Sequence, residues 1–556
     1  MKRNVRLVIA LVSAFLCWLF FTFTSELYLY SDNIDVAIIL NGYYGNPLSQ
    51  YQHPIFCYFI FLLAKIFPFA DMYTVVVHFL VFFELAIFMY IMPEKAMKKS
   101  FKTWALEDFV VSAVSLMFCI FLSAGLNLWR ANYTIIAGSF LFTGWYILAD
   151  ARKKGKRKYW ITIGTIFAFF GYMLRKEAGL LFLPFIGLLL AIEIFSNGKT
   201  KAIVTYYFPA CIAIVILMVT QFVVNSFEPF ATAMRYNDAR TAIVDYPISS
   251  WNEEEMPDIE AADYAAASTW FLSDTDIMTA DRLEIMATAG KRNKYDLSGD
   301  RIKRVLNEMK TKVWGTDIYM SMMIVMCILS ALWNVISQKS WWMKAIAISA
   351  ILGSFIILFY FTIRGRAPFR IWQPVLFAIL SVEASVIING KMHFGSIVRS
   401  AVMLLLFVVL YYSVGQVGAH MKLRSPHTAF TSRVGTDDSA YEQTFRNDDL
   451  YIWPQWHTSI TIHFGDMGKL PTQRVLDHNI AIGDWTSGQP YYTEFLKRIG
   501  HENPIKDLVE KPNVYIMSNE NYILNFLRLH YGEDIELVES GTVNGKTAYQ
   551  VERTGE

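Results

Sequence analysis

The sequence predicts an α-helical protein that crosses a membrane many times and ends in a small α/β domain. The chain of 556 residues is 54% hydrophobic and only 18% charged, with a mean hydropathy of +0.33. Long apolar segments alternate with short basic clusters over about the first three quarters of the chain, as in integral membrane proteins. The net charge of +2 is distributed among these clusters, so no nucleic-acid partner is expected.

Eleven membrane spans are expected, because a hydrocarbon core about 30 Å thick requires roughly 20 apolar residues. They are predicted near residues 5–24, 72–92, 108–125, 133–149, 159–174, 180–195, 202–224, 316–336, 345–363, 371–389 and 401–418. Lys and Arg beside spans accumulate on the cytoplasmic side. The basic clusters are Lys2-Arg3, Lys95 to Lys102, Arg152 to Lys158, Lys199 with Lys201, Lys339 with Lys344, and Lys391 with Arg399. They mark every second loop as internal, which places the N-terminus inside and the C-terminus outside.

One apolar segment is too short to span. Residues 55–67 lie between Pro54 and Pro68 and include Lys65, which predicts an interfacial or re-entrant helix within an outward loop over residues 25–71.

Two further parts of the chain are polar. Residues 225–315 form a large outward loop with a helical, basic pattern near Arg301, and residues 1–418 together make the membrane domain. Residues 419–556 make an outward α/β domain that opens with a linker over residues 425–439. A strand is expected at 513–517, a helix at 522–530, and a hairpin through Asn544-Gly545, because both central positions of a type I′ turn need positive φ.

Two carboxylates follow the first span. Asp32 and Asp35 are three residues apart and therefore lie on one face of a helix, where both can face a cavity as catalytic groups. The alternative is that they cap the helix start. Later in this loop, Tyr43, Tyr44 and His53 are candidates for stacking on a sugar and hydrogen bonding to it, or for turn and packing roles.

Lys and Arg beside spans usually accumulate on the cytoplasmic side, so cations at the outer ends of spans require an explanation. They are Arg130, Arg175, Lys176, Arg364, Arg366 and Arg370. Guanidinium groups bind phosphate oxygens in bidentate fashion, and Gly365 and Pro368 favour a tight bend that directs several donors inward. Contacts with lipid headgroups, or with acids such as Glu177, are the alternative.

A third group follows the seventh span. It consists of Arg235, Asn237, Asp238 and Arg240. The spacing favours a local pair between Arg235 and Asp238, and the same four residues are candidates for contacts with a sugar or acceptor.

These features resemble the GT-C superfamily of polyprenyl-phosphate-sugar-dependent glycosyltransferases, of the protein O-mannosyltransferase and aminoarabinose-transferase type. The shared features are an outward loop that opens with Asp residues, an apolar helix after His53-Pro54, outward arginines and a soluble tail. The resemblance implies that Asp32 or Asp35 is the catalytic base, and that Arg130, Arg175 and Arg366 bind the lipid phosphate. The acidic pair in this chain is Asp-x-x-Asp instead of the adjacent Asp-Glu of the mannosyltransferases, so the choice of base stays open.

The expected activity is inverting, single-displacement transfer of a sugar from a polyprenyl-phosphate carrier to a glycan, lipid or protein at the outer face of a bacterial plasma membrane. No His/Cys metal-ligand spacing is present, and all five cysteines lie in apolar segments. A requirement for Mg²⁺ or Mn²⁺ is left open. The competing functions are an envelope polysaccharide polymerase, a non-catalytic scaffold and a transporter, the last disfavoured because charges are expected only at span ends.

Overall fold

The structure is a computed structural model that describes most of the chain. The residues outside the description are 1–2, 25–31, 100–102, 129–131, 156–157, 198–203, 246–250, 255, 290–297, 315–317, 367, 392–395, 424–447, 455–472, 483–484, 544–545 and 555–556. The predicted linker over residues 425–439 and the Asn544-Gly545 turn therefore lie outside the described residues.

Every segment predicted to span the membrane is helical. The helices of the membrane region are α1 (Arg3–Thr24), α2 (Asp32–Leu40), α3 (Pro54–Ile66), α4 (Met72–Ile91), α5 (Glu94–Met97), α6 (Leu106–Leu128), α7 (Tyr133–Lys154), α8 (Lys158–Leu174), α9 (Lys176–Asn197), α11 (Phe208–Asn225), α16 (Ile318–Ser337), α17 (Trp341–Ile363), α18 (Phe369–Asn389) and α19 (Ser396–Leu423). Within the described residues, the helices that are long and apolar enough to cross a membrane are α4, α7, α9, α11, α16, α17 and α18. The chain is a multi-pass membrane protein, as predicted.

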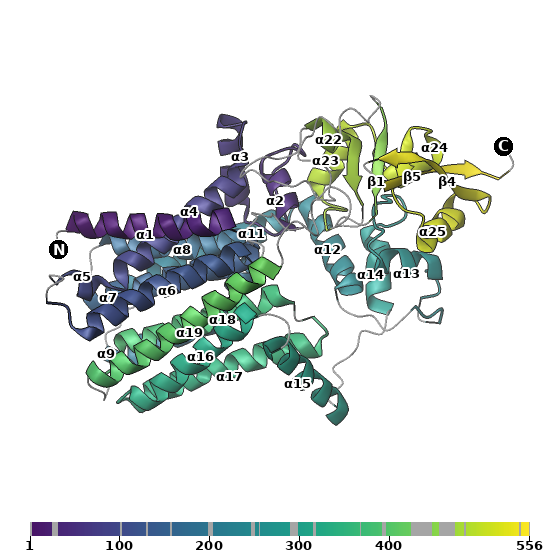
Figure 1. Cartoon of the computed structure of the whole chain (residues 1–556). Helices are drawn as coiled ribbons and strands as arrows, with labels where there is room; N and C mark the ends of the chain where they lie inside the picture. The colour runs from purple at the N-terminus through teal and green to yellow at the C-terminus, as the bar shows by residue number, and fades with distance from the viewer. Residues whose placement is uncertain are drawn as a thin grey trace.

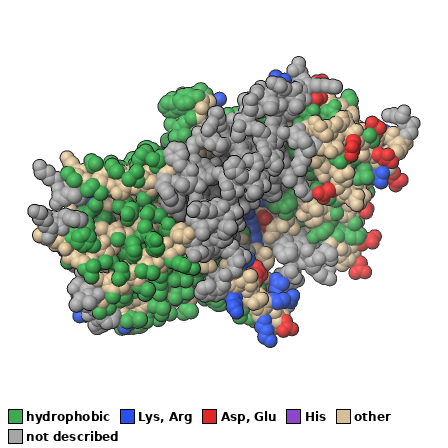
Figure 2. Space-filling model, viewed as in Figure 1, with side chains coloured by type: hydrophobic (Ala, Val, Ile, Leu, Met, Phe, Trp, Pro, Cys, Tyr) green, Lys and Arg blue, Asp and Glu red, His purple; other side chains and the backbone are tan. Residues whose placement is uncertain are grey.

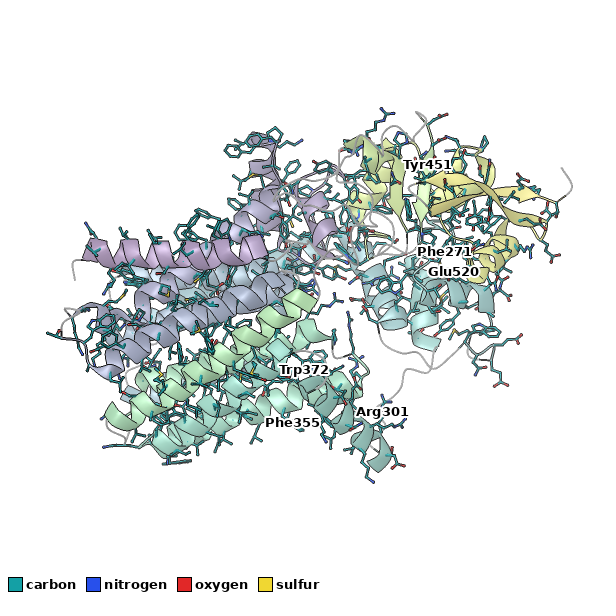
Figure 3. All side chains as sticks on the ribbon, viewed as in Figure 1. Phe271, Arg301, Phe355, Trp372, Tyr451 and Glu520 are labelled. Atoms are coloured by element: carbon teal, nitrogen blue, oxygen red, sulfur yellow. The ribbon has the colours of Figure 1, made fainter. Side chains whose placement is uncertain are left out.

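The outer surface reflects this composition. Apolar side chains cover the helical region in the view of Figure 2, whereas acidic side chains gather over the C-terminal domain and a basic group lies below it. In Figure 3, Phe355 and Trp372 lie within the helical region, Arg301 lies on the separate helix α15, and Tyr451 lies in the sheet. The bilayer-facing and water-facing parts of the molecule are thus at opposite ends.

The basic loops that the sequence assigns to the cytoplasm meet at one end of the helices (Figure 1). Glu94 binds Arg6 at 3.4 Å and Lys154 at 2.6 Å, joining the first span to α7. The amide of Lys339 donates to the carbonyl of Lys391 at 2.8 Å, joining two further basic loops. The C-terminal sheet lies at the opposite end (Figure 1). This agrees with the predicted alternation of loops, while the side of the membrane that each end faces stays a prediction.

Buried carboxylates inside the helices correct one expectation. Glu84 in α4 accepts hydrogen bonds from the hydroxyls of Ser139 at 2.6 Å and Thr143 at 2.5 Å, and Glu383 in α18 accepts one from the amide of Asn334 at 2.6 Å. The expectation that charges lie only at span ends is therefore wrong. Polar groups on neighbouring helices bind one oxygen of each carboxylate, whereas Oε2 of Glu84 and Oε1 of Glu383 are buried without a hydrogen bond within the part of the chain that the structure describes.

Helix α3 is the short apolar helix that the sequence predicts between its two prolines. His53 caps it, because its Nδ1 accepts a hydrogen bond from the amide of Ile55 at 3.2 Å. One face of α3 packs against α4 and α8, while Tyr58, Leu62 and Ile66 remain exposed. An exposed apolar face on a short helix fits a membrane-surface position.

Within the described residues, the loop after α11 forms four helices, and the C-terminal domain contains a five-stranded sheet with helices. The loop helices are α12 (Phe230–Val244), α13 (Ala261–Ser268), α14 (Ala280–Ala289) and α15 (Gly299–Trp314). The domain contains β1 (Leu450–Trp453), α22 (Gln473–His478), β2 (Asn479–Ala481), α23 (Pro490–Arg498), α24 (Pro504–Glu510), β3 (Val514–Ile516), α25 (Asn521–Tyr531), β4 (Ile535–Val543) and β5 (Lys546–Arg553). The strand order is β2-β1-β3-β5-β4, with β1 parallel to β2 and β3, and β5 antiparallel to β3 and β4. The predicted strand, helix and hairpin are confirmed.

The C-terminal domain packs against the outward loops. The side chains of Asn503 and Tyr531 donate to Asp274, at 3.0 and 2.5 Å, and Phe271 packs on Phe526 with ring centroids 5.3 Å apart. Figure 3 places Phe271 near Glu520, the N-cap residue of α25. The loop after α11 and this domain therefore form one surface at the end of the spans opposite the basic loops (Figure 1).

Candidate functional site

Tyr51 joins two arginines from distant parts of the chain. It lies in the loop that precedes α3, and its ring is 4.1 Å from the guanidinium carbon of Arg175. Its hydroxyl accepts a hydrogen bond from Nη2 of Arg240 at 3.2 Å. Its other ring neighbours are Tyr133, at 6.5 Å between centroids, and Trp485 of the C-terminal domain, at 4.8 Å. One aromatic side chain therefore connects the loop before α3 with four later segments.

Arg175 occupies the single-residue break between α8 and α9. Such a tight turn brings the guanidinium to the end of both helices, where Nη1 donates to the hydroxyl of Tyr133 at 3.1 Å. Its Nε lies 2.8 Å from the carboxylate of Glu177, and Nζ of Lys176 lies 3.9 Å from the same carboxylate. The spans predicted over residues 159–174 and 180–195 are thus helices joined by this turn, with Arg175 and Lys176 at it.

Arg240 is almost fully buried on α12, with 1% of its surface exposed. Besides Tyr51, it donates to the side-chain oxygen of Asn237 at 2.6 Å and to the hydroxyl of Thr241 at 3.1 Å. Its guanidinium also lies 5.0 Å from the ring of Trp270. A buried guanidinium is stable only with such a set of acceptors and an aromatic face, because desolvation of the charge is unfavourable.

Arg366 approaches the same place from the loop between α17 and α18. Gly365, with φ of +78°, ends α17 in a Schellman motif, in which the amide of Arg366 donates to the carbonyl of Phe361 and that of Gly365 to Thr362. This is the predicted tight bend. Nη2 of Arg366 binds a carboxylate oxygen of Asp245 at 2.9 Å, and Nη1 of Arg240 lies 4.0 Å from the same oxygen.

These contacts form one continuous group, hereafter the arginine cluster. It comprises Arg175, Arg240 and Arg366 together with Tyr51, Tyr133 and Asp245. The side chains of Arg175 and Arg366 keep 14% and 21% of their surface exposed, so that a ligand can reach them. The cluster lies at the end of the spans opposite the basic loops.

A further carboxylate borders the cluster on α12. Partial desolvation raises the pKa of Asp238, while the charges of Lys176 and Arg240 oppose the rise. Lys176, Glu177 and Asp238 are thus close enough to interact. The region contains four cations, Arg175, Lys176, Arg240 and Arg366, and three carboxylates, Glu177, Asp238 and Asp245. With all of them ionised, these residues carry a net charge of +1.

Two of the predicted site residues have side chains outside the part of the chain that the structure describes, and a third is buried on α2. Arg130 and the side chain of Asp32 fall outside the described residues, although Asp32 begins helix α2. Asp35 lies on the same helix and is buried, with 4% of its surface exposed. Their predicted roles in catalysis and phosphate binding therefore stay predictions.

His53 and Tyr44 have packing roles in the structure. The Nε2 of His53 contacts the carbonyl of Leu217 at 3.0 Å, and burial lowers the pKa of its ring. Tyr44 stacks on Tyr491, with ring centroids 6.1 Å apart and planes 1° from parallel. Tyr43 is half-buried in the turn after α2. The packing alternative accounts for both His53 and Tyr44.

The local pair expected between Arg235 and Asp238 is wrong. Arg235 instead donates to Asp281 at 2.6 Å and to Glu284 at 2.9 and 2.7 Å, both on α14. These hydrogen bonds raise the pKa of Arg235 further. The reason is that α14 packs along α12 and presents two carboxylates on the solvent side, which the spacing within α12 cannot reveal.

Two other predicted cations lie near Arg366, at the end of α17 and the start of α18. Arg364 caps α17 and donates to the hydroxyl of Tyr360 at 3.1 Å. Arg370 is half-buried in the first turn of α18. The predicted cations that the structure describes therefore differ in their surroundings, because helix geometry directs neighbouring residues to different sides.

Sequence reasoning missed Tyr51, Tyr133 and Asp245 as site residues. The sequence feature that could have indicated Tyr51 was its position beside Gln52-His53-Pro54, in the same loop as the candidates Tyr43, Tyr44 and His53. Among the described residues no group of three or more His, Cys, Asp or Glu side chains could hold a metal ion. The requirement for a divalent ion is untested.

Comparisons with known proteins leave the family open. Neither a protein-family model nor a curated protein matches the chain. Among solved structures the chain is similar to ArnT from Cupriavidus metallidurans, determined with bound undecaprenyl phosphate. The two are 9% identical, the alignment covers 98% of this chain and 97% of that one, and the TM-score is 0.41. At this TM-score the likeness carries no argument about the site.

Proposed function

We propose that the protein is a membrane glycosyltransferase that moves a sugar from a polyprenyl-phosphate carrier to an acceptor hydroxyl. The observation that carries the proposal is the arginine cluster, in which three guanidiniums from separate segments meet at the end of the spans opposite the basic loops. Guanidiniums bind phosphate in bidentate fashion and hold their charge at any physiological pH. A lipid carrier lying between spans would present its phosphate at this level.

The cluster suits a phosphate leaving group. In a polyprenyl-phosphate sugar, the bond between C1 and the phosphate oxygen breaks while the acceptor oxygen attacks C1 from the opposite face. Negative charge then develops on the phosphate, and Arg175 and Arg366, both partly exposed, are positioned to stabilise it. Arg240 is buried and holds Tyr51, so we assign it the positioning of the cluster.

Such a leaving group needs no protonation, in contrast to the alkoxide that leaves in glycoside hydrolysis. The enzyme needs only one carboxylate, which accepts the proton of the acceptor hydroxyl as the new bond forms. We propose Asp32 or Asp35 on α2 for this role. The reaction inverts the configuration at C1, because it is a single displacement.

The location proposed for this reaction is the outer face of a bacterial plasma membrane, with a glycan, lipid or protein as acceptor. This rests on the sorting of basic loops to the end opposite the arginine cluster. The topology is tested by Ser540→Cys, at an exposed position on β4 of the C-terminal domain. A thiol reagent that does not cross the membrane should label this variant in intact cells, and labelling only after lysis would contradict the topology.

The proposal is tested by binding of undecaprenyl phosphate to the purified chain in lipid nanodiscs. Arg175→Ala and Arg366→Ala should each weaken binding by about 10-fold or more, roughly 1.4 kcal/mol. The matched control is Arg304→Ala, which removes an exposed cation of α15 outside the arginine cluster. Equal binding by all of these proteins, or none by the wild type, would reject the proposal.

A further inference from the structure

Helix α15 carries cations that are separate from the arginine cluster. The helix contains five basic and two acidic residues, which gives it a net charge of +3. It packs mainly on the spans α17 and α16. The side chains of Lys303 and Lys310 are exposed, and neither is paired with a carboxylate within the described part of the chain. These two lysines are therefore open to an anionic partner.

The two sides of α15 differ in character. Val305 and Met309 lie four residues apart, are buried, and belong to the face that packs on the spans. Lys303 and Lys310 are separated by close to two helical turns and therefore form a line on another side of the helix. Leu306 lies between these lysines and is 43% exposed. Helices that lie on a bilayer present such a surface, with lysines for the headgroups and an apolar side chain for the acyl boundary.

Both ends of α15 are tied to the ends of spans. Nη2 of Arg301 donates to the carbonyl of Ile363, the last residue of α17, at 2.9 Å. At the other end of α15, three residues separate Trp314 from Ile318, where α16 begins. A connection of this length spans at most about 14 Å. Helix α15 therefore runs near the level at which α16 and α17 leave the bilayer.

The arrangement of the molecule agrees with this level. In Figure 1, α15 extends beyond α17 on the side away from the C-terminal domain. Because the spans run across this view, that direction lies in the plane of the membrane. Figure 2 shows the basic group of this region on the outline of the molecule, next to the apolar surface of the spans. A helix at this position lies among the lipid headgroups that surround the spans.

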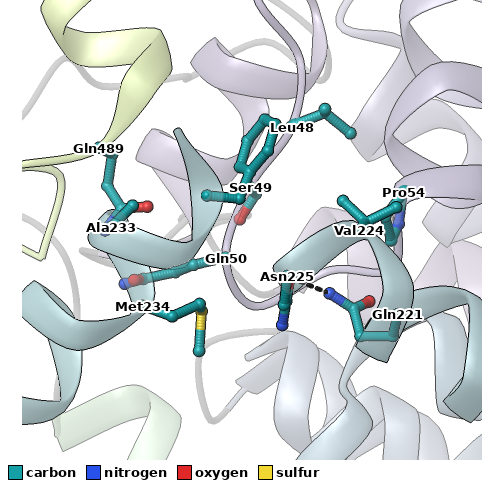
Figure 4. Close-up of a pocket in the computed structure, with 11 residues that line it drawn as sticks. Leu48, Ser49, Gln50, Pro54, Gln221, Val224, Asn225, Ala233, Met234 and Gln489 are labelled. Atoms are coloured by element: carbon teal, nitrogen blue, oxygen red, sulfur yellow. Dashed lines mark hydrogen bonds between the residues drawn. The ribbon is translucent and has the colours of Figure 1, made fainter. Parts of the chain in front are cut away.

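The small pocket beside the arginine cluster is no alternative site for a headgroup. Figure 4 shows its lining, to which the first outward loop contributes Gln50, α11 contributes Gln221 and α12 contributes Met234. The residues that line it include no charged side chain, and the space holds about one water molecule. An anionic headgroup would find neither room nor a counter-ion there.

Arg304 does not belong to the line of lysines on α15. It follows Lys303 directly and therefore lies about 100° further around the helix. It shares its side of the helix with Glu308, four residues later, and that carboxylate offsets its charge. The surface for an anionic partner is therefore limited to Lys303, Leu306 and Lys310.

We infer that α15 binds the phosphate headgroups of anionic phospholipids through Lys303 and Lys310, with Leu306 at the acyl boundary. Cations near a membrane surface are attracted to anionic lipids, whereas a zwitterionic headgroup carries its own cation. The binding does not rest on the proposed transferase function. The hydrogen bond from Arg301 to Ile363 joins this lipid-binding helix to the loop that carries Arg366.

The test uses a nitroxide label at Asn307→Cys in the full chain. Asn307 is exposed and lies four residues after Lys303 and three before Lys310, hence beside both. The chain also carries Cys211→Ala, because the other four cysteines are buried. It is reconstituted in nanodiscs of phosphatidylcholine alone, or of equal amounts of phosphatidylcholine and phosphatidylglycerol. Electron paramagnetic resonance measures relaxation of the label by Ni²⁺ chelated on a lipid headgroup, which acts only near the membrane surface.

Phosphatidylglycerol should increase this relaxation at least about 2-fold, because it draws the lysines to the surface. High ionic strength should reverse the increase. The double variant Lys303→Gln with Lys310→Gln should lose it. The matched control, Lys497→Gln with Lys506→Gln, removes two exposed cations of the C-terminal domain and should keep it. No increase with both lysines present, or an equal increase in the double variant, overturns the inference.

Two further measurements exclude other causes. A soluble nickel complex reports exposure to water, so strong relaxation by this complex and none by lipid-bound nickel would show that the surface faces a soluble partner, which rejects the inference. Lys303 and Lys310 are exposed, so the double variant should melt at the temperature of the wild type in discs of phosphatidylcholine. Equal melting temperatures would show that a lost increase comes from the headgroup contact and not from unfolding.

Discussion

The guanidinium of Arg366 lies 2.9 Å from the carboxylate of Asp245, although one follows α17 and the other ends α12. Arg240 lies 4.0 Å from the same carboxylate oxygen. A carboxylate in this position holds two guanidiniums near each other before a phosphate arrives. It also competes with that phosphate for their donors.

Asp245→Asn should therefore tighten binding of undecaprenyl phosphate. Removing one negative charge beside two arginines should lower the dissociation constant about 3- to 10-fold, because the competing carboxylate is lost. The melting temperature should fall, since the nearly buried Arg240 loses a charged partner and only a neutral amide replaces it. Weaker binding in this variant would mean that Asp245 serves the ligand directly and does not compete with it.

Tyr51 is expected to act through its ring more than through its hydroxyl. Tyr51→Phe keeps the ring against Arg175 and loses one hydrogen bond from Arg240, so phosphate-lipid binding should fall about 3-fold or less. Tyr51→Leu removes the aromatic face as well and should reduce binding about 10-fold, from loss of roughly 1 kcal/mol of cation–π attraction. Isothermal titration with undecaprenyl phosphate compares the two. Equal losses in both variants would contradict the assignment to the ring.

The carboxylates of α2 are expected to serve catalysis and not lipid binding. Asp32→Asn or Asp35→Asn should lower the rate of sugar transfer by about 10²- to 10⁴-fold, the usual contribution of a general base. Binding of undecaprenyl phosphate should be unchanged, because the arginine cluster remains intact. Full transfer activity in both single variants and in the double variant would exclude α2 as the source of the base.

His53 makes stability depend on pH. Burial lowers the pKa of its ring from the usual 6.5, so the folded chain binds the proton less readily than the unfolded chain does. The contribution of His53 is therefore complete above about pH 6.5 and declines as the pH falls towards its lowered pKa. His53→Asn keeps an N-cap side chain for α3 but cannot titrate. Melting curves between pH 7.5 and 5 should show a smaller fall for His53→Asn than for the wild type, and parallel curves would refute this role.

The positions of the spans could be predicted from the sequence because hydropathy is a local property. Each predicted span is a helix, and the short helix after His53-Pro54 is separate from them, as expected. The hairpin of β4 and β5 was also predictable, since alternating apolar residues on either side of Asn544-Gly545 indicate it without any distant contact. The burial of Glu84 inside α4 could not be predicted in this way, because it depends on hydrogen bonds from hydroxyls on α7.

The sequence by itself determined the alternation of loops and the presence of excess cations at one end of the spans, because both follow from the order of residues along the chain. Only the tertiary structure decided which cations share a site. Arg235 and Arg240 lie on one helix, yet α14 pairs with Arg235 on the outer face while Tyr51 and Asn237 enclose Arg240 on the inner face. Such groups arise from packing between distant segments, about which spacing within any one segment carries no information.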